Sequence, residues 1–356
     1  MPEVLADEPL APRTTLRVGG PARRLVEVTT QNELVAAVTG ADAAGEPVLL
    51  LAGGSNVVIA DAGFAGTVIQ IATRGVDRVS APGGGERLTV AAGEPWDDVV
   101  ATTVAAGLAG LECLSGIPGS TGATPIQNVG AYGQEVASTI SGVRVLDRRT
   151  GEAADLEPPA CGFAYRSSAF KRDDRYVVLA VSFDLVRADI SAPLRYGELA
   201  RSLGAGEGEG APLRDVRDAV LALRRDKGMV LDADDHDTWS AGSFFTNPVL
   251  DLNDLAALER RARELDGPDT APPRFPAGDG QVKTSAAWLI ERAGFAKGDV
   301  RGGVALSSRH ALALTNRGGA SSEELIGFAR EIAQRVEELL GVTLVPEPVL
   351  VGIPWG

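Results

Sequence analysis

An uncharged stretch rich in small residues, positions 116–133, limits the possible folds more than any other part of the chain. It reads GIPGSTGATPIQNVGAYG and holds five glycines and two prolines but no charged side chain. Surface loops usually carry more charge. The composition therefore favours the wall of a cofactor site, where backbone N–H groups, hydroxyls and amides bind phosphates and ring edges. A tightly packed buried loop is the alternative that composition leaves open.

A second glycine-rich segment, Gly53-Gly54-Ser55-Asn56, follows the apolar run 48–51. Glycine allows positive φ and close approach of a ligand, so successive N–H groups can form an anion-binding nest. A Rossmann turn would lead into a helix. Here Val57-Val58-Ile59 follows and favours a strand, which excludes that motif but leaves an ordinary turn possible. No Walker-type phosphate loop is present, because Val282 precedes Lys283-Thr284.

Periodicity predicts a mixture of strands and helices, and hence an α+β or mixed α/β protein with several small sheets. The Thr30-Gln31-Asn32-Glu33 capping box predicts one helix start, and Ser321 with Glu324 predicts another. The remaining expected helices cover 96–106, 213–227 and 286–293, and the second capping box opens a helix over 323–340. The expected strands cover 25–28, 48–51, 57–59, 68–71, 88–92, 143–146, 176–185 and 349–351.

Length and charge narrow the classes of function. At roughly 150 residues per domain, 356 residues indicate two to three domains. A net charge of −14 makes general nucleic-acid or anionic-membrane binding a poor expectation, because both need a cationic face. No leader segment and no 18-residue apolar run is visible, so we expect a cytoplasmic protein without membrane insertion.

Two cysteines and two histidines are too few for a Cys/His zinc site or a disulfide framework, and we expect no metal. Cys113 and Cys161 are expected to be small buried thiols, since no Cys–His pair is close in the sequence to support a nucleophile.

Several other segments could carry chemistry, each beside a structural alternative. Gly242–Pro248 places Ser243 and Asn247 beside two aromatics, yet it is not the GxSxG of a hydrolase, and such a serine is often only a turn residue. Arg166 follows Tyr165 and could bind a carboxylate or lie solvated over a sheet. Lys227 lies at the basic C-terminal end of an expected helix, where the helix dipole alone would favour a positive charge. Glu347, between two prolines, is either an edge residue or a functional buried acid.

Taken together, these segments resemble the UDP-N-acetylenolpyruvoylglucosamine reductase (MurB) family. The matching pieces follow the family's order and are Arg17–Ala22, Ala52–Asn56, Ile117–Gly133, Tyr165-Arg166, Gly242–Pro248 and Pro346-Glu347. The resemblance implies two FAD-binding subdomains of the vanillyl-alcohol-oxidase-like flavoprotein fold and a third, substrate-binding domain. The implied boundaries are 1–74 plus 344–356, 75–228 and 229–343.

The resemblance also implies the reaction. NADPH reduces a non-covalently bound FAD, which passes hydride to the enolpyruvyl group of UDP-N-acetylglucosamine enolpyruvate and gives UDP-N-acetylmuramate for peptidoglycan synthesis. By resemblance, Ser243 is the proton donor, and Arg166 and Glu347 polarise and stabilise the enolate-like species. The preference for NADPH over NADH comes from the family alone, and we expect a monomer.

Site residues beyond these three are likewise carried over from the family. The implied flavin contacts are Gly53, Gly54, Ser55, Asn56, Gly119, Ser120, Gly122 and Asn128. The implied sugar-nucleotide contacts are Tyr132, Tyr196, Lys227 and Asn247. Arg292 stands where a family glutamine would contact the substrate.

Two other functions compete with the reductase. An oxidase of the same flavin fold would share the glycine-rich loops but would not need Gly242–Pro248 or Glu347. Many such oxidases attach flavin through His or Cys. A non-catalytic UDP-sugar sensor would keep the pocket, but the joint presence of Ser243, Arg166 and Glu347 argues against it.

Overall fold

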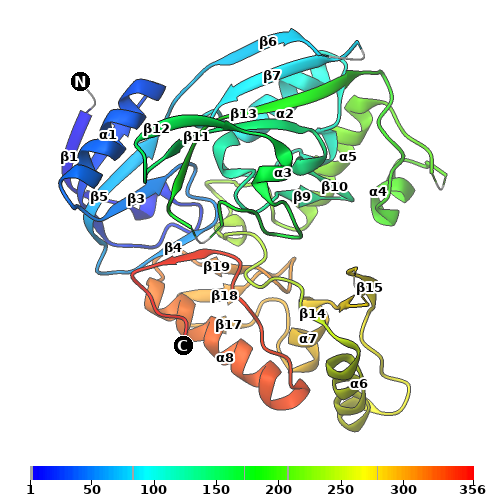
Figure 1. The fold of residues 1–356 in the computed structure, drawn as a ribbon. Coiled ribbons are helices and arrows are strands. Elements are labelled where there is room, and N and C mark those ends of the chain that lie inside the picture. Colours follow the sequence, from blue (N-terminus) through cyan, green and yellow to red (C-terminus); the bar gives the residue numbers. More distant parts are fainter. Residues whose placement is uncertain (1–2, 82–83, 172, 207, 279) are drawn as a thin grey trace. The chain divides into compact units, whose positions relative to one another are not determined.

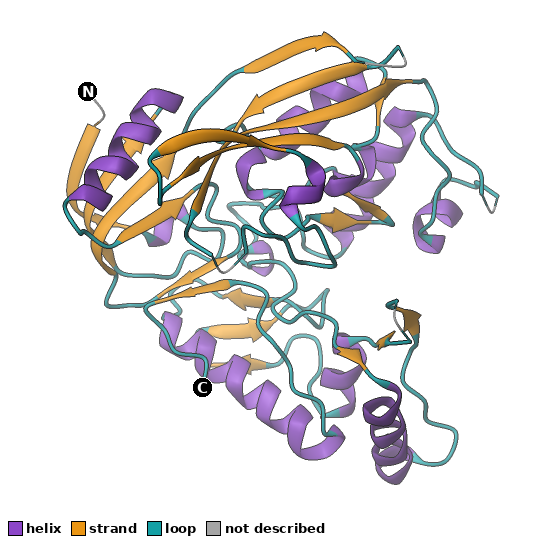
Figure 2. Ribbon diagram, viewed as in Figure 1, coloured by secondary structure: helices purple, strands orange, loops and turns teal. Residues whose placement is uncertain are grey.

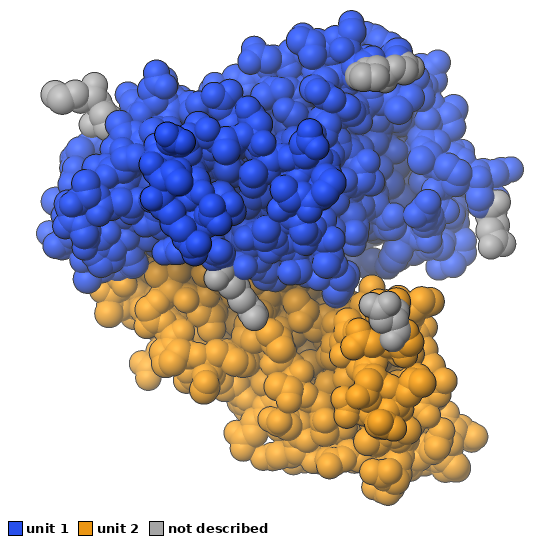
Figure 3. All heavy atoms as spheres, viewed as in Figure 1, with its two compact units in different colours: residues 1–8, 22–54, 64–230 blue, residues 9–21, 55–63, 231–356 orange. Residues whose placement is uncertain are grey.

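The structure, a computed structural model, describes residues 3–81, 84–171, 173–206, 208–278 and 280–356. The chain divides into two compact units, coloured separately in Figure 3. Unit 1 holds residues 1–8, 22–54 and 64–230, and unit 2 holds residues 9–21, 55–63 and 231–356. Both units mix helices with strands, as Figure 2 shows. The predicted division into three domains stays a prediction.

A four-stranded sheet lies at one end of unit 1 (Figure 1). Its order is β1 (Glu3–Pro9), β2 (Pro21–Val28), β5 (Phe64–Ile71), β3 (Val48–Leu51), and β5 runs parallel to both β2 and β3. Helix α1 (Gln31–Ala43) connects β2 to β3 and begins with the predicted Thr30/Glu33 capping box. Its buried Leu34 and Val38 pack in one cluster with Val28 and Ile69, which fixes the helix on the sheet.

The second sheet of unit 1 is antiparallel. Its order is β12 (Glu152–Leu156), β11 (Ile140–Asp147), β13 (Tyr176–Arg187), β7 (Glu86–Ala91), β6 (Val76–Ser80), and β8 (Leu108–Ala109) pairs with the end of β13. Helix α2 (Trp96–Ala105) follows β7, and its buried Trp96 lies 5.8 Å from Phe183 of β13, measured between ring centroids. The other elements of unit 1 are η2 (Glu112–Leu114), η3 (Thr121–Ala123), β9 (Gly130–Ala131), β10 (Gln134–Glu135), η4 (Val136–Ser138), α3 (Pro158–Cys161), α4 (Gly197–Ser202) and α5 (Leu213–Asp226).

The described residues of unit 2 form three small sheets and three longer helices around one apolar cluster. Strand β16 (Val282–Lys283) lies between β14 (Val249–Leu250) and β15 (Phe275–Pro276), and β18 (Val304–Leu306) lies between β17 (Val300–Arg301) and β19 (Leu314–Asn316). Strand β20 (Val349–Val351) pairs in parallel with β4 (Val57–Ile59). The helices are α6 (Leu252–Asp266), α7 (Ala286–Arg292) and α8 (Ser322–Leu340), with short turns η1 (Ala11–Arg13) and η5 (His236–Thr238).

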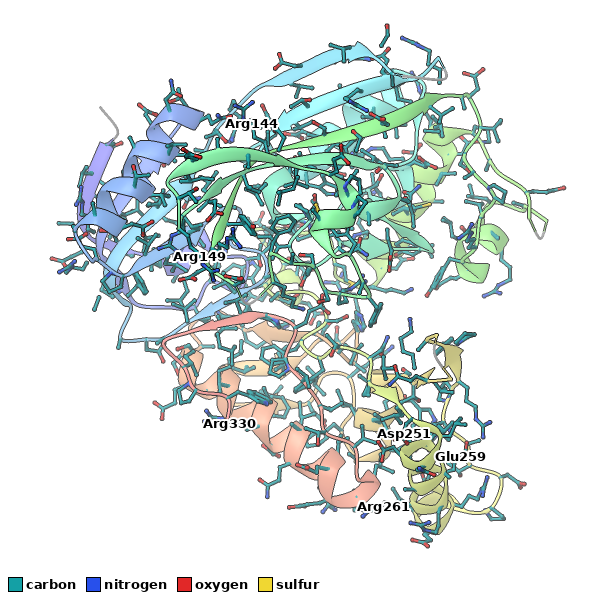
Figure 4. All side chains as sticks on the ribbon, in the orientation of Figure 1. Arg144, Arg149, Asp251, Glu259, Arg261 and Arg330 are labelled. Carbon is teal, nitrogen blue, oxygen red and sulfur yellow. The ribbon has the colours of Figure 1, made fainter. Side chains whose placement is uncertain are left out.

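Helix α8 shows how local sequence and packing agree. The predicted Ser321/Glu324 capping box begins it, and Gly341 ends it with φ +71°. Arg261 of α6 donates to the Glu338 carbonyl oxygen at 3.3 Å, which places a cation at the negative end of the α8 dipole. Arg330, labelled on α8 in Figure 4, donates to the carbonyl oxygens of Pro354 and Trp355 and so holds the chain's last residues to this helix.

In the part of the chain that the structure describes, no helix combines the length and the apolar character that a membrane crossing would need.

Candidate functional site

The two glycine-rich segments approach each other within unit 1, at Gly53 and Gly119. A Cβ atom added at Gly53 would lie 2.6 Å from the Gly119 Cα atom, so no larger residue fits at position 53 without a shift of the backbone. Gly54 and Gly119 have φ of +59° and +118°, which L side chains rarely adopt. Gly53 is therefore required by this close approach, and Gly54 and Gly119 are favoured by their backbone conformation.

The centre of the long segment packs against the turn that leads into α2. The Gly119 carbonyl oxygen accepts from Trp96 N–H at 3.0 Å, and Gly122 N–H donates to the Ala92 oxygen at 2.8 Å. A Cβ at Gly122 would lie 2.5 Å from the Ala92 Cβ. Ser120 and Thr121 are buried. The packed-loop interpretation thus holds for positions 120–122, and it is compatible with a ligand contact through the backbone.

Backbone donors remain where the two segments meet. Among the described residues, no hydrogen bond uses the N–H groups of Gly53, Gly54, Gly119 or Ser120. Successive N–H groups of this kind can bind an anion. The two segments therefore have a donor set that fits the diphosphate of a dinucleotide.

Ser243 and Glu347 lie on adjacent stretches of unit 2. Glu347 N–H donates to the Phe244 carbonyl oxygen at 2.8 Å, and Phe245 forms a β-bridge with Pro346. Phe244 and Phe245 are buried, which explains the two aromatics of this motif as anchors that fix the flanking Ser243. Ser243 and Glu347 are themselves only partly buried.

Asn56 and Asn247 have structural partners in unit 2. The Asn56 side-chain amide donates to the Glu347 carbonyl oxygen at 3.4 Å, and the backbone carbonyl oxygen of Asn56 accepts from Val349 N–H at 3.0 Å. The Asn247 Oδ1 accepts from Ala286 N–H at 2.9 Å, at the start of α7. Ser55 lies beside Asn56 in the same unit and is partly buried.

Arg166 is held by the end of the glycine-rich segment. Its Nη2 donates to the Gly130 carbonyl oxygen at 2.6 Å, and its backbone has φ +50°. Asn128 supports this loop: its Nδ2 donates to Glu135 Oε2 at 2.9 Å and to the Ala164 oxygen at 3.1 Å, and its Oδ1 accepts from Ala137 N–H at 3.1 Å. The Asn128 amide therefore positions the loop that carries Arg166.

Three of the predicted substrate residues come together in unit 1. Tyr132 and Tyr196 form an edge-to-face pair with ring centroids 5.2 Å apart. The Lys227 Nζ lies 5.9 Å from the first ring centroid and 6.0 Å from the second, within cation–π range. It also donates to Glu198 Oε2 at 2.6 Å. Burial lowers the pKa of Lys227, but the hydrogen bond with Glu198 and the attraction to Tyr196, Tyr132 and Glu198 together outweigh this, and the pKa is raised.

Sequence reasoning missed Glu198, Asp97 and Arg217. Asp97 accepts from both terminal nitrogens of Arg217, at 2.6 and 2.8 Å, and from Gly116 N–H at 2.6 Å. This ties α2 and α5 to the start of the glycine-rich segment. No local sequence pattern predicts such a contact, because Asp97 and Arg217 are 120 positions apart.

Arg292 and the cysteines lie apart from these clusters. Arg292 is exposed on α7 and pairs with Asp266 at 3.3 Å. Both cysteines are buried, as expected, and burial raises the pKa of Cys113 to about 12 and that of Cys161 to about 11. Thiols with such pKa values are poor nucleophiles, which is consistent with non-covalent flavin binding.

Comparison with known proteins agrees with these observations. Residues 234–351 match a family model described as the C-terminal domain of UDP-N-acetylenolpyruvoylglucosamine reductase, and residues 22–157 match an FAD binding domain. The reductase of Streptomyces avermitilis is 56% identical over 98% of this chain and 95% of its own length. The reductase of Streptomyces coelicolor is 58% identical over 98% of this chain and 90% of its own length.

Among solved structures, the reductase (MurB) of Thermus caldophilus is similar with a TM-score of 0.64, at 25% identity and over 99% of both chains. The expected fold class, an α+β flavoprotein with an FAD-binding part and a further α+β domain, is confirmed by this likeness and by the FAD-binding model.

Proposed function

Because the chain belongs to the UDP-N-acetylenolpyruvoylglucosamine reductase family, we propose that Ser243, Arg166 and Glu347 carry out its reaction. The reaction is the NADPH-linked reduction of UDP-N-acetylglucosamine enolpyruvate to UDP-N-acetylmuramate, with non-covalently bound FAD as the cofactor. When bound, FAD accepts hydride from NADPH and delivers it to the enolpyruvyl double bond.

The flavin is held mainly by backbone groups in this proposal. The N–H groups of Gly53, Gly54, Gly119 and Ser120 have no protein partner among the described residues and fit the diphosphate. Gly122 keeps the long segment close to the sheet, and Asn128 fixes its far end through three hydrogen bonds. Ser55 and Asn56 supply the remaining contacts.

The protein's chemical task is to stabilise charge and supply one proton. Hydride adds to the terminal alkene carbon, and the electron pair moves toward the substrate carboxylate. The Arg166 guanidinium and the Glu347 carboxyl group polarise this carboxylate and stabilise the charge that develops on it. The Ser243 hydroxyl then gives its proton to the adjacent carbon. Serine is a weak acid, so this step needs a strongly basic carbon and a fixed hydroxyl.

The single observation that best supports these roles is the hydrogen bond from Glu347 N–H to the Phe244 carbonyl oxygen, 2.8 Å long. It sets Phe244, the residue next to Ser243, against Glu347, although Phe244 and Glu347 are 103 positions apart in the chain. An oxidase or a UDP-sugar sensor has no need for a hydroxyl and an acid on two neighbouring stretches of backbone.

The sugar nucleotide is bound by Tyr132, Tyr196, Lys227 and Asn247 in this proposal. Lys227 suits the pyrophosphate, which must then compete with the Glu198 carboxylate already 2.6 Å from its Nζ. We also propose that the protein is a cytoplasmic monomer and that its product supports cell-wall synthesis, and so cell shape and division.

Anaerobic visible absorbance tests the function. NADPH should bleach the flavin band, and UDP-N-acetylglucosamine enolpyruvate should then restore it. A band that returns only with oxygen would indicate an oxidase. Tight binding of the UDP-sugar without any NADPH oxidation would indicate a sensor.

A further inference from the structure

The turn that carries Arg166 has a backbone conformation that arginine does not favour. Ala164 and Ser167 donate their N–H groups to each other's carbonyl oxygens, at 3.0 and 3.1 Å. Tyr165 and Arg166 are therefore the two central residues of a tight turn, and Arg166 has φ +50°. A turn with positive φ at its second central residue usually has glycine or asparagine there, because a Cβ atom makes this conformation unfavourable. Such strain persists only where the surrounding structure fixes the backbone.

The contacts described above fix the side chain of Arg166 and not its backbone. Its Nη2 donates to the Gly130 carbonyl oxygen at 2.6 Å, and its Nη1 donates to the Asn128 carbonyl oxygen at 3.4 Å. These bonds can aim the guanidinium only while the turn keeps its conformation. A contact to the Arg166 backbone itself is therefore needed.

Lys171 makes that contact. Its Nζ donates to the Arg166 carbonyl oxygen at 2.7 Å. The direction of this carbonyl group depends on ψ of Arg166, so the hydrogen bond restrains the second backbone dihedral of the strained residue. A bond from an ammonium group is charge-assisted and stronger than a bond between neutral groups.

The backbone of Lys171 is anchored by its neighbours. Phe170 is 5% exposed, and its ring lies 6.1 Å from that of Tyr176 on β13, measured between centroids. Lys171 N–H donates to the Ser168 carbonyl oxygen at 3.2 Å, and Ser168 Oγ donates to the Ile126 carbonyl oxygen at 2.6 Å. The partly buried lysine side chain thus reaches back to the turn from a fixed base.

We propose that Lys171 is a positioning residue for Arg166, which locks the turn 164–167 and so aims the guanidinium before any substrate binds. Groups that are already oriented stabilise developing charge without a further cost of reorganisation. Lys171 acts through the Arg166 carbonyl group and not on the substrate. The inference rests on the proposed function, because that function gives Arg166 its task.

Amide hydrogen exchange on the FAD-loaded protein without substrate tests the lock itself. Lys171→Met removes the charged donor and keeps an unbranched side chain, and Lys297→Met removes an exposed lysine of unit 2 as the control. In Lys171→Met, exchange at the Ala164 and Ser167 amides should accelerate about tenfold or more, while exchange at the buried Val181 of β13 stays within about twofold of wild type. Lys171→Arg, which keeps a charged donor, should restore most of the protection.

Stopped-flow absorbance then tests the consequence for the reaction. Lys171→Met should slow reoxidation of the reduced flavin by UDP-N-acetylglucosamine enolpyruvate by about 10- to 100-fold, as a small misplacement of a catalytic group does. Reduction of the flavin by NADPH should be unchanged. In protein that already carries Arg166→Met, the further change Lys171→Met should cost nothing, because the group that it positions is absent.

Three results would overturn the proposal: exchange at Ala164 and Ser167 that equals the Lys297→Met control, equal acceleration at these amides and at Val181, or an equal further loss from Lys171→Met when Arg166 is already replaced. The second would mean that Lys171 supports the whole fold, and the third that it acts without Arg166. Faster exchange at the turn with wild-type reoxidation would support the positioning role and count against the proposed role of Arg166 instead.

If Lys171→Met does not fold, Lys171→Gln decides. Glutamine is a neutral donor on a shorter side chain, so faster exchange at the turn supports the proposal and wild-type exchange overturns it.

Discussion

At the scale of single residues, the Ser243 hydroxyl is the group whose removal should separate the two half-reactions. We predict that Ser243→Ala lowers overall turnover by about 10²–10⁴-fold, the usual effect of losing a positioned general acid. Flavin reduction by NADPH should persist, because it needs no proton from this residue. Stopped-flow absorbance measures each half-reaction.

Thr246→Val is the matched control for that experiment. Thr246 lies three residues along the same segment, and its hydroxyl donates to the Val345 carbonyl oxygen at 3.4 Å. It should retain most turnover. Wild-type turnover in Ser243→Ala would contradict the assignment of the proton donor.

Asp237 should control the pH dependence of stability. Burial raises its pKa, but hydrogen bonds from Ser308, Arg309 and Ser307 outweigh this and hold the pKa below its ordinary value of 3.8. A depressed carboxyl pKa stabilises the fold above the unfolded-state value, and the contribution is lost as pH falls through the folded-state value. We predict that Asp237→Asn lowers the free energy of unfolding at pH 7 by about 2–3 kcal/mol.

Urea unfolding at several pH values measures this effect. The difference between wild type and Asp237→Asn should shrink below about pH 4 and vanish at still lower pH. A difference that stays constant from pH 7 to pH 3 would show that the charge of Asp237 is not responsible.

The sequence supplied candidate residues for the site but not the hydrogen-bond partners of their side chains. The motifs placed Ser243, Arg166 and Glu347 among the candidates, since each stands in an unusual local context. They could not reveal that the Asn128 amide bonds Glu135, Ala164 and Ala137, because those contacts depend on a loop whose path no local pattern encodes.

At the scale of elements, the contact between η3 and the strand end near Ala92 leaves no space for a side chain. A Cβ at Gly122 would lie 2.5 Å from the Ala92 Cβ and 2.9 Å from its Cα. We predict that Gly122→Ala destabilises the protein by about 1–3 kcal/mol, as overpacking does, and lowers the FAD content. Thermal unfolding and the flavin absorbance of purified protein measure the two effects.

Gly40→Ala is the control with the opposite expected sign. Gly40 lies inside α1, and nothing stands within 4 Å of an added Cβ. The substitution should stabilise the protein by about 0.5–1 kcal/mol, because alanine loses less backbone freedom in a helix. Equal effects of the two substitutions would contradict the packing argument.

Element prediction succeeded where the signal was local. Both capping boxes begin helices, and the expected helix 213–227 corresponds to α5. The strand expected at 57–59 is present too. The prediction missed β6, all of whose residues are exposed, because a strand without a buried face has no alternation to detect. It also missed α6, which begins after the Asp251 cap.

At the scale of the whole molecule, bound flavin should raise stability by mass action. With FAD at 100 times its Kd, the free energy of unfolding should rise by about 2.7 kcal/mol over the flavin-free protein. Riboflavin lacks the diphosphate that the N–H groups of Gly53 and Gly119 are proposed to bind. It should therefore raise the thermal midpoint much less at equal concentration. Equal stabilisation by both would contradict this role of the backbone donors.

The pairing of β4 with β20 has a consequence for biosynthesis. Residues 57–59 bind residues 349–351, so β4 leaves the ribosome almost 300 residues ahead of its partner. At about 5–20 residues per second, it waits for roughly 15–60 s. During that time Val57, Val58 and Ile59, all buried in the finished protein, lack their partner strand. The nascent chain thus exposes an unpaired apolar strand until translation is almost complete. We expect this strand to be prone to aggregation, and to need chaperones most, during this interval.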